Sequence, residues 1–362
     1  MDRARTGRNR EAYMRILILG ASYGSLLSTK LLMAGHDVTL VCMPAEAELI
    51  NATGTTVRMT LRGEDEPRLL RSGDFPGTLD AVTPGDADPA AYDLVAMAMQ
   101  EPQYSAPEIR DLLKRIGEAR VPCMSIMNMP PLSYLRRIPV IDGDSLTDCF
   151  ADASVWDAIE PSLMTLCSPD PQAFRPPEEG LNFLHVGLPT NFKAAAFDDP
   201  AHTAILKTLE ADIAAVTLDG KDVPVKLRVH DSPFVPFAKW SMLLTGNYRC
   251  IEADGIRPIR EAVHSDIDAS REVYEWVDAL VRKLGAGNED AVPFEKYANA
   301  ARSLLKPSSA ARAIDAGAPA IERVDRLVQT LGRAQGMQSD TVDQTVKVVD
   351  ARLQENRAKA KT

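Results

Sequence analysis

The chain has 362 residues, of which 45% are hydrophobic and 25% are charged. This is the composition of a globular protein, and the length predicts two or three domains. The 41 basic and 51 acidic residues give a formal net charge of −10, and they are spread along the chain rather than gathered in one block. Such a balance disfavours nucleic acid and anionic membranes as main partners, so we expect a small-molecule substrate.

The cysteines and the N-terminal stretch indicate the cellular compartment in which we expect the protein. The five cysteines are far apart, with no CxxC motif and no histidines at metal-ligand spacing. We therefore expect reduced thiols, no metal site and a cytoplasmic location. Residues 1–14 are basic and polar without an apolar centre, which argues against a secretory signal and predicts a disordered leader. No later run is long and apolar enough to predict a membrane-spanning helix.

The first predicted element is a buried strand. Residues 15–20 (RILILG) form a continuous apolar run, which is typical of a strand covered on both faces of a parallel sheet. A glycine-rich turn follows, and then a helix over residues 23–34 that ends at Gly35. Residues 36–42 are rich in β-branched side chains and predict a second strand. Together these segments form one βαβ unit.

The alternation of strands and helices continues beyond this unit. Strands are predicted at residues 92–99 and 121–127, with a helix near residues 105–117 between them. This pattern predicts a Rossmann-like, doubly wound parallel sheet, whose ligands bind outside the carboxyl ends of the strands. The strand ends at which we expect the chemistry are Gly20, Cys42, Gln100 and Asn128.

The second half of the chain has a different pattern. Between about residues 140 and 200 prolines and strand-like pieces (163–166 and 181–186) predict an additional edge of the same domain. From residue 235 onward apolar side chains recur at helical spacing, which predicts core-facing helices. We therefore expect a dinucleotide-binding domain over residues 15–231 and an all-helical substrate and dimerisation domain over residues 232–356.

The turn Gly20-Ala-Ser-Tyr-Gly24-Ser25 has the structural context of a dinucleotide-binding loop, because it follows a strand and opens a helix. Gly20 suits the tight turn and Gly24 suits close packing of the helix on the sheet. Ser22 stands where the middle glycine is usual, and the loop is one residue shorter than GxGxxG. The free N–H groups at the helix start, with the Ser22 and Ser25 hydroxyls, would bind a pyrophosphate. A tight turn without a ligand is the alternative.

Two stretches near the N-terminus resemble the opening of the ketopantoate reductases. They are Ile16-Leu-Ile-Leu-Gly-Ala-Ser-Tyr-Gly-Ser-Leu-Leu and Ala34-Gly-His-Asp-Val-Thr-Leu-Val41. Asp93-Leu-Val-Ala-Met-Ala-Met-Gln-Glu-Pro-Gln103 resembles the strand and turn of that family that carries a glutamine, here Gln103. Asn128 falls on the family's asparagine at the nicotinamide side of the cofactor. The resemblance implies NAD or NADP as the cofactor, with Gln100, Gln103 and Asn128 among its contacts.

The C-terminal half continues the resemblance in the same order. Ala238-Lys-Trp-Ser-Met-Leu-Leu-Thr-Gly-Asn247 resembles the family helix that begins the second domain, with Lys239 at the catalytic lysine and Asn247 at a substrate asparagine. The segment after Ser308 resembles the region of the substrate serine, which is Ser309 here. The resemblance implies NAD(P)-dependent reduction of a 2-oxo acid, or of a related carbonyl compound or imine, in a homodimer.

Four positions depart from the family pattern. Gln100 replaces a lysine that binds NADP, and Met43 replaces a basic residue after the second strand. Leu243 replaces the first substrate asparagine, and Ile321, beside Glu322, stands at the acidic substrate residue. Ketopantoate is therefore not the expected substrate. The choice between NAD and NADP stays open, and we expect discrimination for the 2′-phosphate to be weak or to favour NAD.

The candidate chemistry centres on Lys239. Hydride delivery leaves an alkoxide on the former carbonyl carbon, so the reaction needs a proton donor, and a partly desolvated lysine suits this task. Asn247 follows eight residues later, just over two helical turns, so both side chains are expected on one helix face. Asn128 would orient the nicotinamide amide or Lys239. Ser309 and Glu322 would contact the substrate.

Each of these residues also has an ordinary structural interpretation. Lys239 can be a solvated lysine at a helix start, Asn128 a turn residue, and Asn247 a helix-interior asparagine bonded to the backbone. Ser309 and Glu322 can be a helix cap and a solvated helix carboxylate. For the whole chain, the alternatives are a dinucleotide-binding regulatory protein without turnover and an opine-type dehydrogenase.

Overall fold

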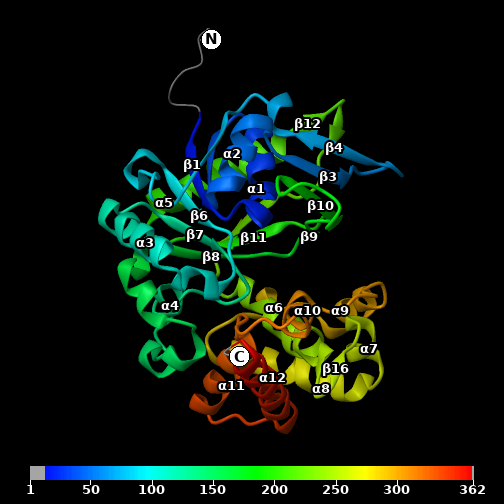
Figure 1. Ribbon diagram of the computed structural model, residues 1–362. Coiled ribbons are helices and arrows are strands. Elements are labelled where there is room, and N and C mark those ends of the chain that lie inside the picture. The colour runs from blue at the N-terminus through cyan, green and yellow to red at the C-terminus, as the bar shows by residue number, and fades with distance from the viewer. Residues whose placement is uncertain (1–12, 361–362) are drawn as a thin grey trace.

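The computed structural model describes residues 13–360, so nearly all of the leader predicted over residues 1–14 lies outside the described part of the chain. The two larger sheets gather in one lobe and the C-terminal helices in another, with the polypeptide crossing between them just before α6 (Ala238–Met242) (Figure 1).

An eight-stranded sheet forms the centre of the N-terminal half. Its strands are β1 (Arg15–Leu19), β2 (Asp37–Val41), β5 (Leu79–Val82), β6 (Leu94–Met97), β7 (Cys123–Ile126), β8 (Met164–Ser168), β11 (Phe192–Ala195) and β14 (Leu227–His230). They lie in the order β14-β11-β8-β7-β6-β1-β2-β5. The six strands from β8 to β5 run parallel, whereas β11 pairs antiparallel with β8 and parallel with β14. This confirms the predicted Rossmann-like sheet.

The predicted strands are confirmed where the side chains on both faces of the strand are apolar. Ile16, Leu17, Ile18 and Leu19 are all fully buried, because helices or further chain cover both sides of β1. The carboxyl ends of the parallel strands meet at one edge of the sheet, and this edge faces the helical lobe (Figure 1).

A second, four-stranded sheet packs on the outer side of α1 (Ala21–Met33), the helix that follows β1. Its strands are β3 (Thr56–Thr60), β4 (Pro67–Arg71), β9 (Gln172–Phe174) and β10 (Phe183–Leu188), in the order β4-β3-β10-β9. The segment 181–186, predicted as a strand-like piece at an additional edge of the domain, forms β10 and pairs with β3. Leu184 and Val186 alternate with less buried residues along this strand, and β10 packs against α1.

Helix α1 lies between the two sheets and is buried along most of its length. The other helices of this half are α2 (Pro44–Thr53), α3 (Pro107–Ala119), the short α4 (Leu132–Leu135) and α5 (Pro200–Ala215). A small hairpin of β12 (Thr217–Leu218) and β13 (Lys221–Asp222) precedes β14. Like β1, β2, β6 and β7, helices α1 and α3 lie where the sequence predicted them.

The C-terminal half is helical. It contains α6, a π-helical segment (Leu243–Asn247), α7 (Ile259–His264), α8 (Ile267–Lys283), α9 (Phe294–Ala301), α10 (Ser309–Asp315), α11 (Val324–Ala334) and α12 (Asp340–Lys359). The predicted apolar stripes of α8, α11 and α12 are buried, as at Val277, Val328 and Val349. A small hairpin of β15 (Ile251–Glu252) and β16 (Gly255–Ile256) lies among these helices.

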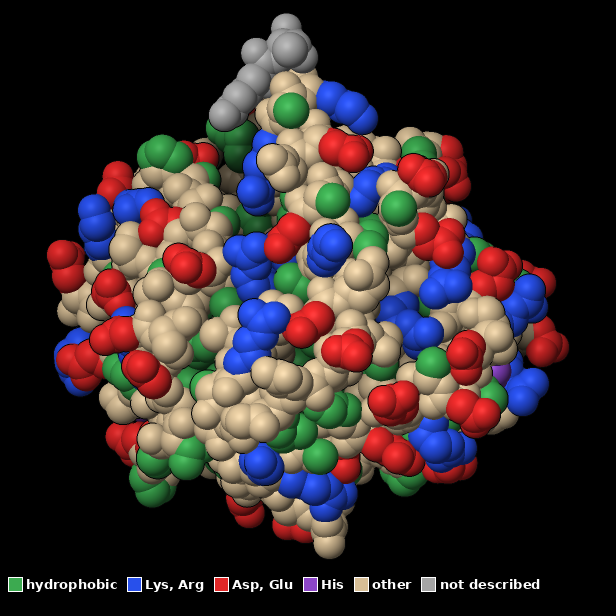
Figure 2. Space-filling view, turned by 90° about the horizontal axis from the view of Figure 1, so that it is seen from below, with side chains coloured by type: hydrophobic (Ala, Val, Ile, Leu, Met, Phe, Trp, Pro, Cys, Tyr) green, Lys and Arg blue, Asp and Glu red, His purple; other side chains and the backbone are tan. Residues whose placement is uncertain are grey.

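The surface and the cysteines are ordinary for an acidic globular chain. Acidic and basic side chains are interspersed over the face seen from the helical side (Figure 2). All five cysteines are buried free thiols. Within residues 13–360, no helix has the length and apolarity that crossing a membrane would require. In the same range, no three His, Cys, Asp or Glu side chains are grouped so that they could hold a metal ion.

Candidate functional site

The glycine turn lies at the carboxyl end of β1, between the ends of β2 and β6. The Gly20 N–H donates to the Val41 carbonyl, and Gly20 has a φ of +96°, which side chains disfavour. A Cβ at Gly20 would lie 2.6 Å from Met99 Cγ and 3.0 Å from the Ala98 carbonyl oxygen. At Gly24 a Cβ would lie 2.7 Å from Ile18 Cγ2, so this glycine lets α1 approach the sheet closely.

The start of α1 has no side-chain cap. Its first N–H groups therefore lack the partners that a capping side chain would give, and the exposed Ser22 lies beside them. Ser25 differs from the expectation, because its buried hydroxyl donates to the Ala21 carbonyl within the helix. Tyr23 donates its hydroxyl to the Pro171 carbonyl at 2.7 Å, which ties the turn to the segment after β8.

Asn128 and Glu322 come together at the carboxyl end of β7. The Asn128 side-chain amide donates to Glu322 Oε2 at 3.2 Å, and the backbone of Glu101 and Met129 also bonds to this carboxylate. Burial raises the pKa of Glu322, while these hydrogen bonds and the charge of Lys239 oppose the rise. The Asn128 Oδ1 atom is buried and has no hydrogen-bond partner in the described part of the chain. An orphaned acceptor of this kind is costly unless a ligand donates to it.

Lys239 lies on α6 opposite the end of β8. Its ammonium group donates to the Pro169 carbonyl and lies 3.6 Å from Asp170, with the side chain 20% exposed. Burial lowers the pKa of Lys239, and the charges of Asp170 and Glu322 oppose the shift. The Lys239 side chain is therefore mostly buried, and its contact with Asp170 is longer than a direct hydrogen bond.

Asp170 is a site residue that the sequence analysis missed. Burial would raise its pKa, but Lys239, Lys193 and a hydrogen bond from Ser168 lower it below the ordinary value. Lys193 lies 3.1 Å from this carboxylate. The available signal was the position of Ser-Pro-Asp-Pro (168–171) directly after a buried strand, where parallel sheets carry their ligands.

Glu101 was also missed. It follows β6, is 2% exposed, and accepts hydrogen bonds from the Ala151 N–H at 3.1 and 3.3 Å. The pKa of Glu101 is raised to about 8, mainly by burial and also by the nearby charge of Glu322. In the same turn Gln100 and Gln103 are exposed, and Gln103 Oε1 accepts from the Gln100 N–H at 2.9 Å.

The two remaining candidates lie in the helical half. Asn247 ends the π-helical segment, and its backbone carbonyl accepts from the Ser308 hydroxyl at 2.7 Å. A π turn takes more residues than an α turn, so the eight residues from Lys239 to Asn247 come closer to two full turns. Ser309 is exposed, and the cap of α10 is Ser308, whose hydroxyl also accepts from the Ala311 N–H.

An ion pair stands at the carboxyl end of β2, where dinucleotides place their adenosine ribose. Glu46, in the first turn of α2, pairs with Arg175, which follows β9. Both groups act on the pKa of Cys42, which burial raises to about 12. Met43, the apolar residue that the sequence places here, is exposed. A basic group is therefore present at this edge, supplied from a distant part of the chain.

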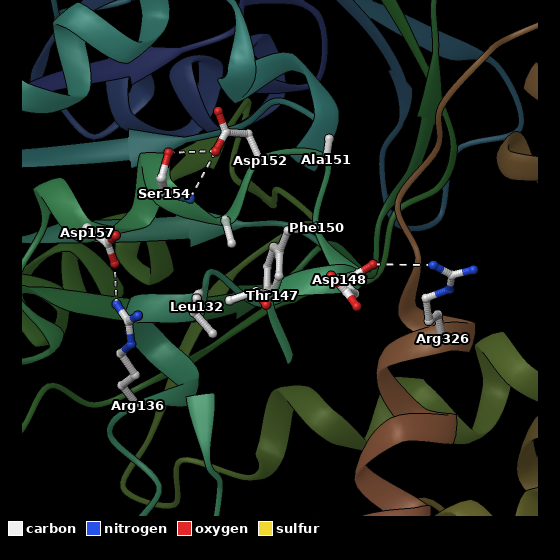
Figure 3. Close-up of a pocket in the computed structure, with 11 residues that line it drawn as sticks. Leu132, Arg136, Thr147, Asp148, Phe150, Ala151, Asp152, Ser154, Asp157 and Arg326 are labelled. Atoms are coloured by element: carbon white, nitrogen blue, oxygen red, sulfur yellow. Dashed lines mark hydrogen bonds and ion pairs between the residues drawn. The ribbon is translucent and has the colours of Figure 1, made fainter. Parts of the chain in front are cut away.

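A polar cavity of about 550 Å³ lies between the segment 132–157 and α11 (Figure 3). Across it, Arg326 donates to the Asp148 carbonyl at 3.4 Å. Arg326 also pairs with Asp350, and Arg136 pairs with Asp157. Both arginines already have carboxylate partners within their own half of the chain, and only the bond from Arg326 to the Asp148 carbonyl joins the two halves.

Solved structures share this architecture over nearly the whole chain. The 2-dehydropantoate 2-reductase from Methylococcus capsulatus has a TM-score of 0.64 at 12% identity and covers 94% of this chain and 97% of its own. D-mandelate dehydrogenase, solved with NADH and anilino(oxo)acetate, has a TM-score of 0.62 at 14% identity and covers 95% and 100%. A dimeric ketopantoate reductase from Staphylococcus aureus has a TM-score of 0.58 at 9% identity and covers 95% and 100%.

The chain has the ketopantoate reductase fold. In sequence it matches no family model. It matches no curated protein either. The positions that depart from the ketopantoate reductase motifs are instructive, because Leu243 and Ile321 are apolar and only 3% exposed. Where those motifs carry polar substrate contacts, this chain has core residues.

Proposed function

We propose that the protein is an NAD(P)-dependent oxidoreductase that reduces a 2-oxo acid, or a related carbonyl compound or imine, with Lys239 as general acid. One observation carries the proposal. Asn128, at the carboxyl edge of the sheet, donates a hydrogen bond to the Glu322 carboxylate. Lys239, from the helical half, lowers the pKa of the same carboxylate by its charge. A proton donor and a candidate cofactor-orienting amide therefore face one site.

The residues present fit a nicotinamide dinucleotide. The uncapped start of α1 and the exposed Ser22 offer donors to a pyrophosphate. Asn128 Oδ1 lacks a donor, and the carboxamide of a nicotinamide would supply one. Gly20, Gly24 and the exposed turn after β6 would complete the binding surface. Ser25 is left out, because its hydroxyl is already bonded within α1.

Lys239 would donate a proton to the substrate oxygen. When bound, the reduced nicotinamide supplies the hydride. Burial moves the pKa of Lys239 down toward the working range, which makes proton donation easier, while Asp170 holds the side chain in place. Asn247 and Ser309 would orient the substrate from the helical half. The mandelate dehydrogenase neighbour was solved with anilino(oxo)acetate, which supports this substrate class.

The apolar substitutions indicate which members of the class fit. Leu243 and Ile321 cannot hydrogen-bond a hydroxylated substrate such as ketopantoate. We therefore propose a 2-oxo acid whose side chain is apolar.

The domain organisation follows the same proposal. Strand β14 ends at His230 and α6 begins at Ala238, so residues 15–231 would bind the dinucleotide and residues 232–356 would contribute substrate contacts and a homodimer interface. The dimeric neighbour from Staphylococcus aureus supports the dimer. A cytoplasmic location remains a prediction.

A fluorescence titration with NADH and with NADPH tests the cofactor part, and a panel of 2-oxo acids followed at the nicotinamide absorbance tests turnover. Binding with turnover of at least one oxo acid is the expected result. Cofactor binding without turnover of any oxo acid, of any imine, or of any oxo acid offered together with an amino acid would favour a dinucleotide-binding regulatory protein. Absence of binding of both cofactors would overturn the proposal.

A further inference from the structure

A second polar cavity of about 620 Å³ lies in the N-terminal half, and none of the residues around Asn128 and Lys239 lines it. It is formed by the turn after β3, the starts of β11 and β14, and the end of α5. The volume is in the range of small-molecule sites. The polar side chains that line it are Thr60, Arg62, Asn191, Asp222, Lys226 and Arg228.

The charge of this cavity is opposite to that of the chain. Its walls carry three basic side chains and one acidic side chain, whereas the whole chain has a net charge of −10. Arg62 and Arg228 are exposed, and neither guanidinium group makes an ion pair or a hydrogen bond within residues 13–360. Unpaired arginines in a cavity favour carboxylate or phosphate groups, which they bind in a bidentate manner.

Lys226 and Asn191 add oriented donors. The Asn191 Oδ1 atom accepts from the Lys226 N–H at 2.8 Å, so the NH₂ group of the same amide is left to donate elsewhere. The Lys226 side chain is 9% exposed, and its ammonium group bonds to the Ala214 carbonyl at 3.1 Å and to Asp222 at 2.7 Å. The preceding Val225 has a φ of +64°, a strained conformation for a β-branched residue.

A buried lysine lies beneath the same turn. Lys30 on α1 is 0% exposed and donates to the Val223 carbonyl at 3.3 Å. The pKa of Lys30 is lowered to about 7, mainly by burial and also by the positive charge of Lys226, while Asp222 opposes the shift. An anion in the cavity would stabilise the charged form of Lys30, so its binding would take up protons near neutral pH.

We propose that this cavity is a second ligand site, which binds the phosphate or carboxylate groups of a small anionic molecule through Arg62, Arg228, Lys226 and the Asn191 amide. The site is separate from the dinucleotide site of the proposed function. Neither site depends on the other for its evidence.

The test is calorimetric titration with pyrophosphate and with citrate, which separate phosphate from carboxylate ligands. The variant that replaces both exposed arginines, Arg62→Gln with Arg228→Gln, should bind the preferred anion at least about tenfold more weakly. A control with Arg71→Gln and Arg302→Gln has the same net charge and also replaces exposed arginines, and it should bind like the parent. Affinity for NADH should be the same in all three proteins.

Lys30 gives an independent readout. At pH 7.5 the parent should take up a fraction of a proton on anion binding, seen as a dependence of the heat on the ionisation enthalpy of the buffer, and Lys30→Met should lose this dependence. Binding that persists unchanged in the double arginine variant would place the anion elsewhere, such as the start of α1, and would overturn the proposal. So would the absence of binding of both probes at millimolar concentration.

Discussion

The Asn128 side-chain amide donates to the Glu322 carboxylate at 3.2 Å, although the two residues are 194 positions apart. In this contact the amide nitrogen donates and the carboxylate oxygen accepts, which leaves Asn128 Oδ1 as an acceptor without a partner in the described chain. This contact joins the sheet to the helical half at the place where the resemblance to ketopantoate reductases implies a nicotinamide.

The first prediction concerns this orphaned acceptor. Asn128→Ala should raise the Kd for NADH about tenfold, because one hydrogen bond to the nicotinamide carboxamide is lost. Fluorescence titration measures the change. ADP-ribose, which lacks the nicotinamide, serves as the control and should bind equally to parent and variant. An equal loss for both ligands would mean that the substitution damages the site generally.

The second prediction concerns the form of the cofactor. Because Glu46 neutralises Arg175 at the end of β2, we expect the parent to discriminate weakly between NADH and NADPH. Arg175→Gln should weaken NADPH binding by about tenfold or more, through loss of a charge-assisted contact, and leave NADH within about threefold. Glu46→Gln should shift the preference from NADH toward NADPH. It frees the Arg175 guanidinium group for the 2′-phosphate and removes an acceptor for the ribose hydroxyls.

A control for this pair is Arg302→Gln, which removes an exposed charge in the helical half. It should leave both affinities unchanged. Parallel losses for NADH and NADPH in Arg175→Gln would contradict a role for this side chain at the 2′-phosphate.

The centre of the main sheet could be predicted from the sequence, because β1, β2, β6 and β7 are short apolar runs. β1 is the clearest case, since Ile16 to Leu19 are buried on both faces. The second sheet could not be predicted in the same way. Strand β3 alternates buried and half-buried residues, and β4 has only one buried residue. The pairing of β10 with β3 joins segments more than 120 residues apart.

The site shows the same limit. Lys239 and Asn128 were proposed from motifs, because each lies in a recognisable local pattern. Asp170, Glu101 and Arg175 were missed, because what distinguishes them is a partner far away in the sequence: Lys239, Ala151 and Glu46. Burial of a carboxylate is decided by tertiary packing and leaves no mark in the local sequence.

The third prediction concerns Glu101. Its folded-state pKa of about 8 lies above the ordinary value of 4.5, so the folded protein holds a proton that the unfolded chain releases between these pH values. The stability contribution is therefore present at low pH and is lost as the pH rises from about 4.5 to 8. Relative to Glu101→Gln, the parent should lose stability over this window, by on the order of 4 kcal/mol at most.

Denaturant unfolding of both proteins between pH 5 and pH 9 measures this difference. The shift of Lys30 is common to both proteins and cancels in the comparison. Glu108→Gln, an exposed carboxylate on α3, is the control and should follow the parent. Parallel pH profiles for the parent and Glu101→Gln would show that Glu101 is already ionised in the folded state.

The last prediction concerns Lys239. If this lysine protonates the developing alkoxide, Lys239→Ala should lower kcat by on the order of 10² to 10⁴-fold and leave cofactor affinity nearly unchanged. Asn247→Ala should act mainly on KM, because an orienting amide contributes to binding before the transition state. Asp170→Asn should lower the pKa of the upper limb of the pH–rate profile, because it removes the negative charge that favours protonated Lys239.

Lys347→Ala, an exposed lysine on α12, is the control for loss of a positive charge and should behave like the parent. A Lys239→Ala protein that turns over a confirmed substrate at nearly the parent rate would exclude the lysine as proton donor. Glu322 would then be the next candidate, together with bound water, because burial raises its pKa and it already contacts Asn128. In that case Glu322→Gln, rather than Lys239→Ala, should lower kcat.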